Sequence, residues 1–288
     1  MGFRLVTLGV ALALSVCFAN DATAKREWSR LMNPEQAVAA MRVPGLRIVD
    51  IRHRKLGFVR GHIPGSVSMP FWSWRGPRGN AGRPPSEADL SAMVSEAGLN
   101  LDDQILIVHS GLNEASFAGA AWVYWVMKSS GFAEIAILDG GIRAWKAAGG
   151  AVTKKTSAFA PTRIEVTFDT TWLASTDEVE QITSGNSAGT LLDARADEVQ
   201  DTRTISGAMS YAMTRLLEPS RQKALTPLDT LEKLKNAPIN WQAENVVTFC
   251  NNGMQGAATW FMASEIAGIR NVKLYAESLA GWMQRPSN

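Results

Sequence analysis

Cysteine is scarce in this sequence, which has only Cys17 and Cys250 among its 288 residues. No run of basic residues suggests nucleic acid, because the 29 Lys and Arg are scattered among 27 Asp and Glu and the net charge is +2. No apolar stretch beyond the N-terminal one is long enough to span a membrane. These absences argue against nucleic acid as a partner and against a disulfide framework. The hydrophobic content of 46% and charged content of 19% are typical of a folded globular protein.

The N-terminus has the pattern of a secretory signal peptide. Arg4 precedes an apolar run over residues 5–19, and small residues follow at Ala22 and Ala24. We expect residues 1–24 to be a signal peptide cut after Ala24, and the protein to be exported to the periplasm. A membrane anchor is the alternative, but the run is shorter than the roughly 20 apolar residues of a spanning helix. The mature form is therefore expected to have no membrane association.

Export leaves Cys250 as the single thiol. Removal of the signal peptide also removes Cys17, so the mature chain can form no internal disulfide. A lipidated Cys17 is the weaker alternative, because Val16 is larger than the residue normally found before a lipidated cysteine. An exported protein with one thiol is unusual, so Cys250 either is buried or has a chemical role.

The sequence contains two copies of one unit, about 140 residues apart. Each copy has an apolar strand that ends in Asp-x-Arg, with Asp50 and Arg52 in the first copy and Asp193 and Arg195 in the second. The further matching stretches are 62–66 with 204–208, 102–110 with 243–250, and 120–145 with 258–282. This period is too long for a solenoid repeat, and each copy can bury a core of its own.

The repeat predicts an N-terminal domain at 25–150, a linker rich in small and turn-forming residues at 151–163, and a C-terminal domain at 164–288. Strands alternate with helical patterns in each copy, which predicts α/β domains, each with a mostly parallel sheet flanked by helices. In such sheets, ligands bind beyond the carboxyl ends of the strands. We expect Ser110 and Cys250 at such ends, one in each copy.

The stretch "CNNGMQG", residues 250–256, predicts a turn around a reactive sulfur. With a strand before it and a helix beginning near Gln255, the backbone amides of the turn can stabilise a thiolate. Gly253 provides a position of free φ, and Gly256 allows close approach of the backbone. The alternative is that Cys250 is a small buried hydrophobe, since free cysteine is among the most buried residue types.

In several motifs the chain resembles the tandem-domain rhodanese family, the thiosulfate and 3-mercaptopyruvate sulfurtransferases. The motifs are "VDIR…GHIPGS" and "LDGGIRAW" in the first copy, and "LLDAR", "VVTFC" and "CNNGMQ" in the second. The resemblance covers essentially the whole mature chain. It implies two rhodanese-like domains, an inactive N-terminal one with Ser110 in the place of the cysteine and a catalytic C-terminal one.

The resemblance also implies the reaction. Cys250 takes a sulfane sulfur from a small-molecule donor, such as thiosulfate, as a persulfide and passes it to cyanide or a thiol, or to a protein sulfur acceptor. No metal and no organic cofactor is needed. Arg195 is the candidate for orienting an anionic donor, and its alternative role is an ion pair with Asp193. The other expected substrate-binding residues are those of the turn, Asn251, Asn252, Gly253, Met254 and Gln255.

The turn departs from the family pattern because it has no charged residue. Without a cation, affinity for a dianionic donor should be weaker. An alternative function is therefore an exported persulfide-relay or binding module with a protein partner and little small-molecule turnover. An open apolar surface around Cys250 would favour the relay module, and a narrow cationic pocket would favour the enzyme.

Overall fold

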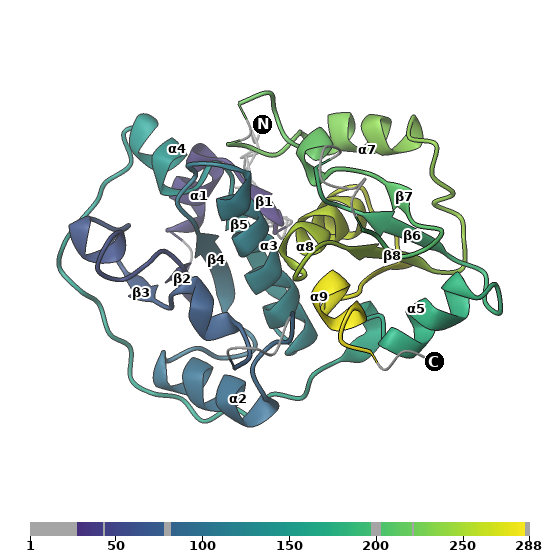
Figure 1. Ribbon diagram of the computed structural model, residues 1–288. Coiled ribbons are helices and arrows are strands. Elements are labelled where there is room, and N and C mark those ends of the chain that lie inside the picture. Colours follow the sequence, from purple (N-terminus) through teal and green to yellow (C-terminus); the bar gives the residue numbers. More distant parts are fainter. Residues whose placement is uncertain (1–27, 43, 78–81, 197–202, 221, 286–288) are drawn as a thin grey trace, which may run out of the picture.

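The computed structural model describes residues 28–42, 44–77, 82–196, 203–220 and 222–285, and it has two α/β units side by side (Figure 1). The predicted signal peptide lies outside these ranges. Within them, no helix has the length and apolar character of a membrane span. The predicted architecture of two α/β domains with parallel sheets flanked by helices is confirmed.

The first domain has a parallel sheet in the order β1-β5-β4-β2-β3. Its strands are β1 (Leu31–Met32), β2 (Leu46–Asp50), β3 (Ser66–Ser68), β4 (Gln104–Val108) and β5 (Glu134–Leu138). Its helices are α1 (Pro34–Ala40), α2 (Glu87–Glu96), α3 (Glu114–Ser129) and α4 (Gly141–Ala147), with 3-10 turns η1 (Phe58–Arg60) and η2 (Phe71–Trp74).

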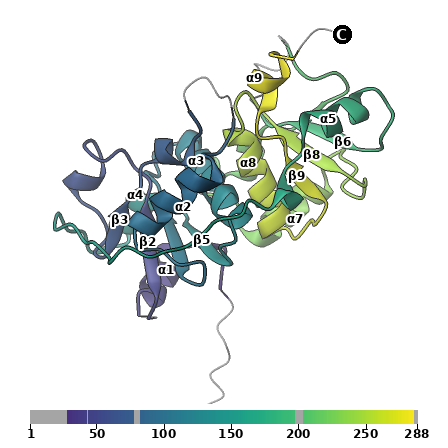
Figure 2. The same cartoon turned by 90° about the horizontal axis from the view of Figure 1, so that it is seen from below.

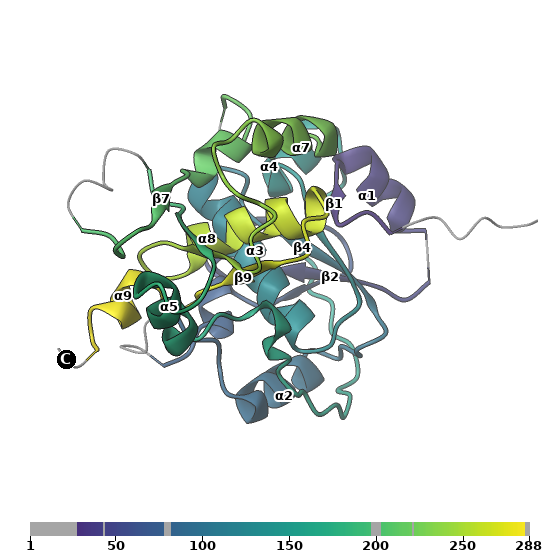
Figure 3. The same ribbon diagram turned by 90° about the vertical axis from the view of Figure 1, so that its right-hand side faces the viewer.

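The second domain repeats this plan with the order β7-β6-β8-β9, again parallel. This domain faces the viewer in Figure 3. Its strands are β6 (Thr190–Asp193), β7 (Met209–Ser210), β8 (Val246–Phe249) and β9 (Val272–Leu274). Its helices are α5 (Thr176–Thr183), α7 (Pro227–Lys235), α8 (Met254–Trp260) and α9 (Ser278–Trp282), with 3-10 turns η3 (Thr170–Trp172) and η4 (Met213–Leu216) and a π-helical segment η5 (Phe261–Ile266) after α8.

Local sequence explains where most of the longer helices begin. Before each of these helices lies a polar residue whose backbone is extended. Its side chain accepts a hydrogen bond from the third backbone N–H of the helix, which would otherwise be unpaired. These caps are Asn33 for α1, Ser86 for α2, Asn113 for α3, Ser175 for α5 and Thr226 for α7. The helix α8 differs, because its cap is Gly253 and has no side chain.

Strand β8 is buried on both faces, as expected for a strand between two helical layers. Val247 and Phe249 belong to a cluster with residues of α5 and α9. Val246 and Cys250 belong to the cluster on the opposite face, which includes α8 and continues into the first domain. Because side chains alternate along a strand, the thiol at the end of β8 is directed to the side of the domain interface.

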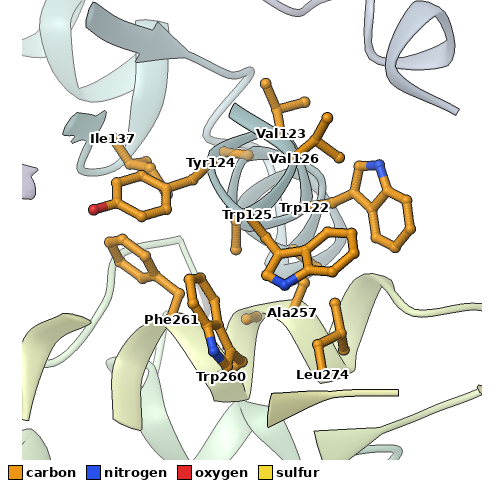
Figure 4. Packing of buried hydrophobic residues seen from close by; sticks show 14 of the residues in the cluster. Trp122, Val123, Tyr124, Trp125, Val126, Ile137, Ala257, Trp260, Phe261 and Leu274 are labelled. Carbon is orange, nitrogen blue, oxygen red and sulfur yellow. The ribbon is translucent and has the colours of Figure 1, made fainter. Parts of the chain in front are cut away.

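The two domains meet through α3 and α8, which pack against each other with aromatic side chains between them (Figure 4). The rings of Tyr124 and Phe261 meet edge to face at 4.8 Å between centroids. Trp122, Trp125 and Trp260 are completely buried in the same cluster. Burying such a side chain stabilises the fold by roughly 1.5–3 kcal/mol, so this contact is a substantial part of the domain interface.

A buried carboxylate adds polar contacts to this interface. Glu265 of η5 accepts a hydrogen bond from the Tyr124 hydroxyl at 2.8 Å and forms ion pairs with Arg30 at 2.9 Å and Lys128 at 3.2 Å. All three partners belong to the first domain, so these bonds fix the register of α3 against the second domain.

The segment between α4 and η3, which contains the predicted linker 151–163, is bound along the first domain (Figure 2). The Thr162 hydroxyl donates to Leu99 O at 2.6 Å, and the Arg47 guanidinium lies 4.1 Å from the Phe159 ring centroid. The segment therefore packs as part of the first domain, and the predicted domain boundaries on either side of it stay a prediction.

His109, directly after β4, is a buried neutral histidine. Its pKa is lowered from 6.5 to about 4, mainly because burial disfavours the charged ring. Nε2 lies 3.1 Å from Leu138 O, while Nδ1 receives the Gly111 N–H at 3.3 Å. The neutral ring with its proton on Nε2 satisfies both contacts.

This pKa makes the stability of the protein dependent on pH. Below pH 6.5 the unfolded chain takes up a proton at His109, whereas the folded protein does so only near pH 4, so stability is lost as the pH falls through this window. Between pH 7.5 and 5, we expect this residue to lower the free energy of unfolding by about 2 kcal/mol. Urea unfolding at both pH values, with His109→Gln as control, measures it. Equal pH dependence in the two proteins would contradict the assignment.

Candidate active site

Cys250 lies at the carboxyl end of β8 and exposes 1% of its surface. Two hydrogen bonds with the first two residues of α9 hold its backbone. The Cys250 N–H donates to Ser278 Oγ at 3.0 Å, and the Leu279 N–H donates to Cys250 O at 3.0 Å. The thiol is thus buried, and its backbone is fixed on both sides.

Ser278 is a positioning residue that the sequence reasoning missed. It has φ +53°, the left-handed conformation that non-glycine residues seldom adopt and that is often found at functional sites. Its hydroxyl donates to Tyr275 O at 2.9 Å while it accepts the Cys250 N–H. The repeat contained a signal, because counting back from Trp282 and Trp145 pairs Ser278 with Gly141, which has φ +57°.

The turn after Cys250 needs its glycines, as predicted. Gly253 has φ +91°, and a Cβ there would lie 2.5 Å from Ala276 O and 2.6 Å from the Trp122 ring. A Cβ on Gly256 would lie 2.9 Å from Leu274 and 3.0 Å from the Phe249 backbone. The helix begins at Met254, one residue before the expected start. That the turn's amides donate to the sulfur stays a prediction.

The first domain provides the cation that the turn lacks. Arg75, directly after η2, lies with its guanidinium carbon 4.1 Å from the Trp122 ring centroid, and its Nη2 donates to Asn252 O at 2.9 Å. Burial lowers the pKa of Arg75 below its usual value, and the neighbouring Cys250 partly opposes this. Arginine stays protonated despite such shifts.

One nitrogen of this guanidinium is left for a ligand. Nη1 of Arg75 is buried and has no hydrogen-bond acceptor among the described residues. A buried donor without a partner is costly, so an anion bound within reach of Nη1 would gain a strong hydrogen bond there. Sequence reasoning missed Arg75 because it lies 177 positions from its partner Asn252 and outside both repeated motifs.

Comparison with known proteins identifies the family. A model of the rhodanese-like domain matches the chain twice, at residues 33–148 and 175–285. The chain belongs to the rhodanese family.

Its relatives have names that share sulfur transfer. A putative thiosulfate sulfurtransferase of Synechococcus elongatus is 25% identical over 292 residues, covering 95% of this chain and 89% of its own. A probable 3-mercaptopyruvate sulfurtransferase of Pseudomonas aeruginosa is 27% identical over 286 residues, covering 90% and 96%. The crystal structure of the 3-mercaptopyruvate sulfotransferase SseA from Escherichia coli matches with a TM-score of 0.74 at 17% identity, covering 87% of this chain and 98% of SseA, and this likeness shows the fold.

The Asp-x-Arg motif forms the same contacts in both rhodanese domains, an ion pair within the motif and a hydrogen bond from the Arg to a backbone carbonyl. Arg195 Nη2 lies 2.6 Å from Asp193 Oδ2 and 2.7 Å from Arg203 O. In the first domain, Arg52 Nη2 lies 2.6 Å from Asp50 Oδ2 and also binds a backbone carbonyl. Because the same ion pair is present in the first domain, which has no thiol, the ion pair does not require a catalytic cysteine. This supports the ion-pair role of Arg195.

A donor-orienting role for Arg195 stays a prediction. The residue is 4% exposed, and its Nη1 lies 3.5 Å from the Asn251 side-chain oxygen, so it does adjoin the turn. Asn251 and Asn252 are exposed, while Met254 and Gln255 are half-buried. Their contact with a substrate likewise stays a prediction. Within the described ranges, no group of three or more His, Cys, Asp or Glu side chains could hold a metal ion.

The expectation that Ser110 occupies the place of the cysteine is wrong by one residue. Val108 pairs with Asp50 as Phe249 pairs with Asp193, so His109 is the counterpart of Cys250. The reason is loop length, since the loop before α3 is one residue longer than the loop before α8. The first rhodanese domain thus has a neutral imidazole where the second has a thiol.

The effect of Arg75 on the Cys250 thiol can be tested with two alkylating reagents that differ in charge. Because Arg75 attracts anions, iodoacetate should react with Cys250 faster, relative to neutral iodoacetamide, in the wild type than in Arg75→Gln, by about threefold to tenfold. Arg83→Gln is the matched control, since Arg83 forms an exposed ion pair with Glu277 at 2.7 Å in the same region. An unchanged ratio of rate constants in Arg75→Gln would show that Arg75 does not act on the thiol.

Proposed function

We propose that the protein is a sulfurtransferase that moves a sulfane sulfur, from thiosulfate or a related anionic donor, through a persulfide on Cys250 to cyanide or a thiol. The observation that supports this most is the contact of Arg75 with the turn that follows the buried Cys250, where its Nη2 donates to Asn252 O at 2.9 Å. A cysteine that served only as a core residue would gain nothing from a half-buried cation at its turn.

In the first half-reaction the Cys250 thiolate attacks the outer sulfur of thiosulfate. A sulfur–sulfur bond forms to Cys250, and the bond within thiosulfate breaks. Sulfite leaves with the bonding electron pair, so the charge of −3 on the two reactants is conserved in persulfide and sulfite. Arg75 Nη1 is the donor available to the sulfonate oxygens, whose negative charge grows as sulfite departs.

In the second half-reaction cyanide or a thiolate attacks the terminal sulfur of the persulfide. With cyanide, a carbon–sulfur bond forms, thiocyanate leaves and the Cys250 thiolate is regenerated. Splitting the transfer into two displacements is covalent catalysis. The 1% exposure of Cys250 protects the persulfide between the two steps, because oxidants reach buried sulfur slowly.

The choice between thiosulfate and 3-mercaptopyruvate rests on charge. The turn has no charged side chain, which weakens binding of a dianion. Arg75 compensates from the other domain, so an anionic donor fits this site better than the turn alone indicates. Both donors carry a sulfonate or carboxylate that a guanidinium binds well, and the experiment below separates them.

The second candidate is an exported persulfide relay with a protein acceptor. Such a module would present its sulfur on an open apolar surface, whereas Cys250 is buried beside a cation. This geometry favours small donors for loading. Delivery to a protein acceptor, and export after cleavage at Ala24, remain part of the proposal.

Mass spectrometry of the intact protein tests the proposal. After thiosulfate or 3-mercaptopyruvate, we expect the mass to rise by one sulfur, about 32 Da, and to fall again with cyanide as thiocyanate appears. Peptide mapping should place the sulfur on Cys250, and Cys250→Ser should gain none. The mass of the exported protein also locates its N-terminus, expected at Lys25.

Ser110→Ala is the matched control for that experiment, because it removes the polar side chain at the corresponding edge of the first sheet without touching the thiol. It should load and unload sulfur as the wild type does. If neither donor adds sulfur to the wild type, the small-molecule proposal fails and a protein donor is required.

A further inference from the structure

The first domain has a large cavity at the edge of its sheet that corresponds to the active site. The cavity measures about 740 Å³ and lies beyond the carboxyl ends of β2 and β4. Its lining includes His109 and Ser110, and His109 is the counterpart of Cys250. Because ligands of parallel α/β sheets bind at this edge, the cavity has the position of a binding site but no thiol.

Most of the cavity wall is apolar. Phe71, Leu56, Leu112 and Ile142 contribute to it from the first domain, and Met254 contributes from the second. Leu56 and Leu112 are unusually exposed for leucine, at 66% and 62%. Large apolar side chains at the rim of a cavity stabilise an apolar ligand, because the ligand removes them from water.

The charge of the lining has one sign. Arg143 and Lys146 border the cavity from α4, three positions apart, and both are exposed. Neither forms an ion pair with a carboxylate of the described residues. No Asp or Glu belongs to the lining, whereas the guanidinium of Arg52 does and is already paired with Asp50. Two unpaired cations beside an apolar cavity favour a ligand with one anionic end.

We propose that this cavity binds a small amphipathic anion, with an apolar body against Phe71 and Met254 and a carboxylate or sulfonate at Arg143 and Lys146. The volume falls within the range of pockets that hold drug-sized ligands and far exceeds what a donor such as thiosulfate requires. Met254 follows the Cys250 turn, so the ligand would contact the chain that forms the active site of the other domain.

Two dyes that differ in charge test the proposal. The probes are 1-anilinonaphthalene-8-sulfonate and its uncharged analogue N-phenyl-1-naphthylamine, titrated by fluorescence against the wild-type protein. We expect the sulfonate to bind at one site. The double variant Arg143→Gln/Lys146→Gln should lower the affinity for the sulfonate about fivefold or more and the affinity for the neutral dye less than about twofold.

A second variant fixes the location. Ala115 is exposed on α3 and lines the cavity, so the Trp side chain of Ala115→Trp should fill the cavity. The affinity for both dyes should then fall by about tenfold or more. The matched control is Ala92→Trp, an exposed helical alanine on α2 outside the cavity lining. Circular dichroism confirms that each variant is folded.

Three results would overturn the proposal. The first is no saturable binding of the sulfonate by the wild type. The second is equal affinity in Ala115→Trp and Ala92→Trp, which places the dye elsewhere. The third is an equal effect of the double glutamine variant on both dyes, which shows that the cavity does not select for negative charge. None of these results depends on sulfur transfer.

Discussion

The contact of Trp122 with the Cys250 turn is the interaction on which the site depends. Its ring leaves no room for a Cβ on Gly253, and its face supports the Arg75 guanidinium at 4.1 Å. Its indole N–H donates to Trp74 O at 2.8 Å, which ties the ring to the turn that precedes Arg75. One buried side chain of the first domain thus positions both the turn and the cation of the second domain's site.

This contact gives the first domain a role despite its missing thiol. The aromatic packing of α3 against α8 and the Glu265 ion pairs hold the domains in one register. A short turn without charged residues can then serve anionic chemistry, because the charge comes from across the interface. The arrangement also buries Cys250, which slows the access of oxidants to the thiol.

Local features could be predicted from the sequence because they depend on neighbouring residues. The repeat predicted the two α/β domains. The glycines after Cys250 predicted a turn in which Gly253 has unusual backbone freedom, and its φ is positive. Features that depend on distant contacts could not be predicted. Arg75 meets the turn only after both domains pack. Ser110 was assigned as the counterpart of Cys250, one position away from the true counterpart, His109. The extra residue in the loop before α3 can be located only from the pairing of the strands.

The central claim is that both domains build one site around Cys250, and a crystal structure of the protein after reaction with thiosulfate tests it most directly. We expect an additional sulfur atom on Cys250 Sγ, with Arg75 still stacked on Trp122 and its Nη1 within hydrogen-bond distance of the persulfide or of a bound anion. A sulfur-loaded Cys250 with Arg75 turned away into solvent would contradict it.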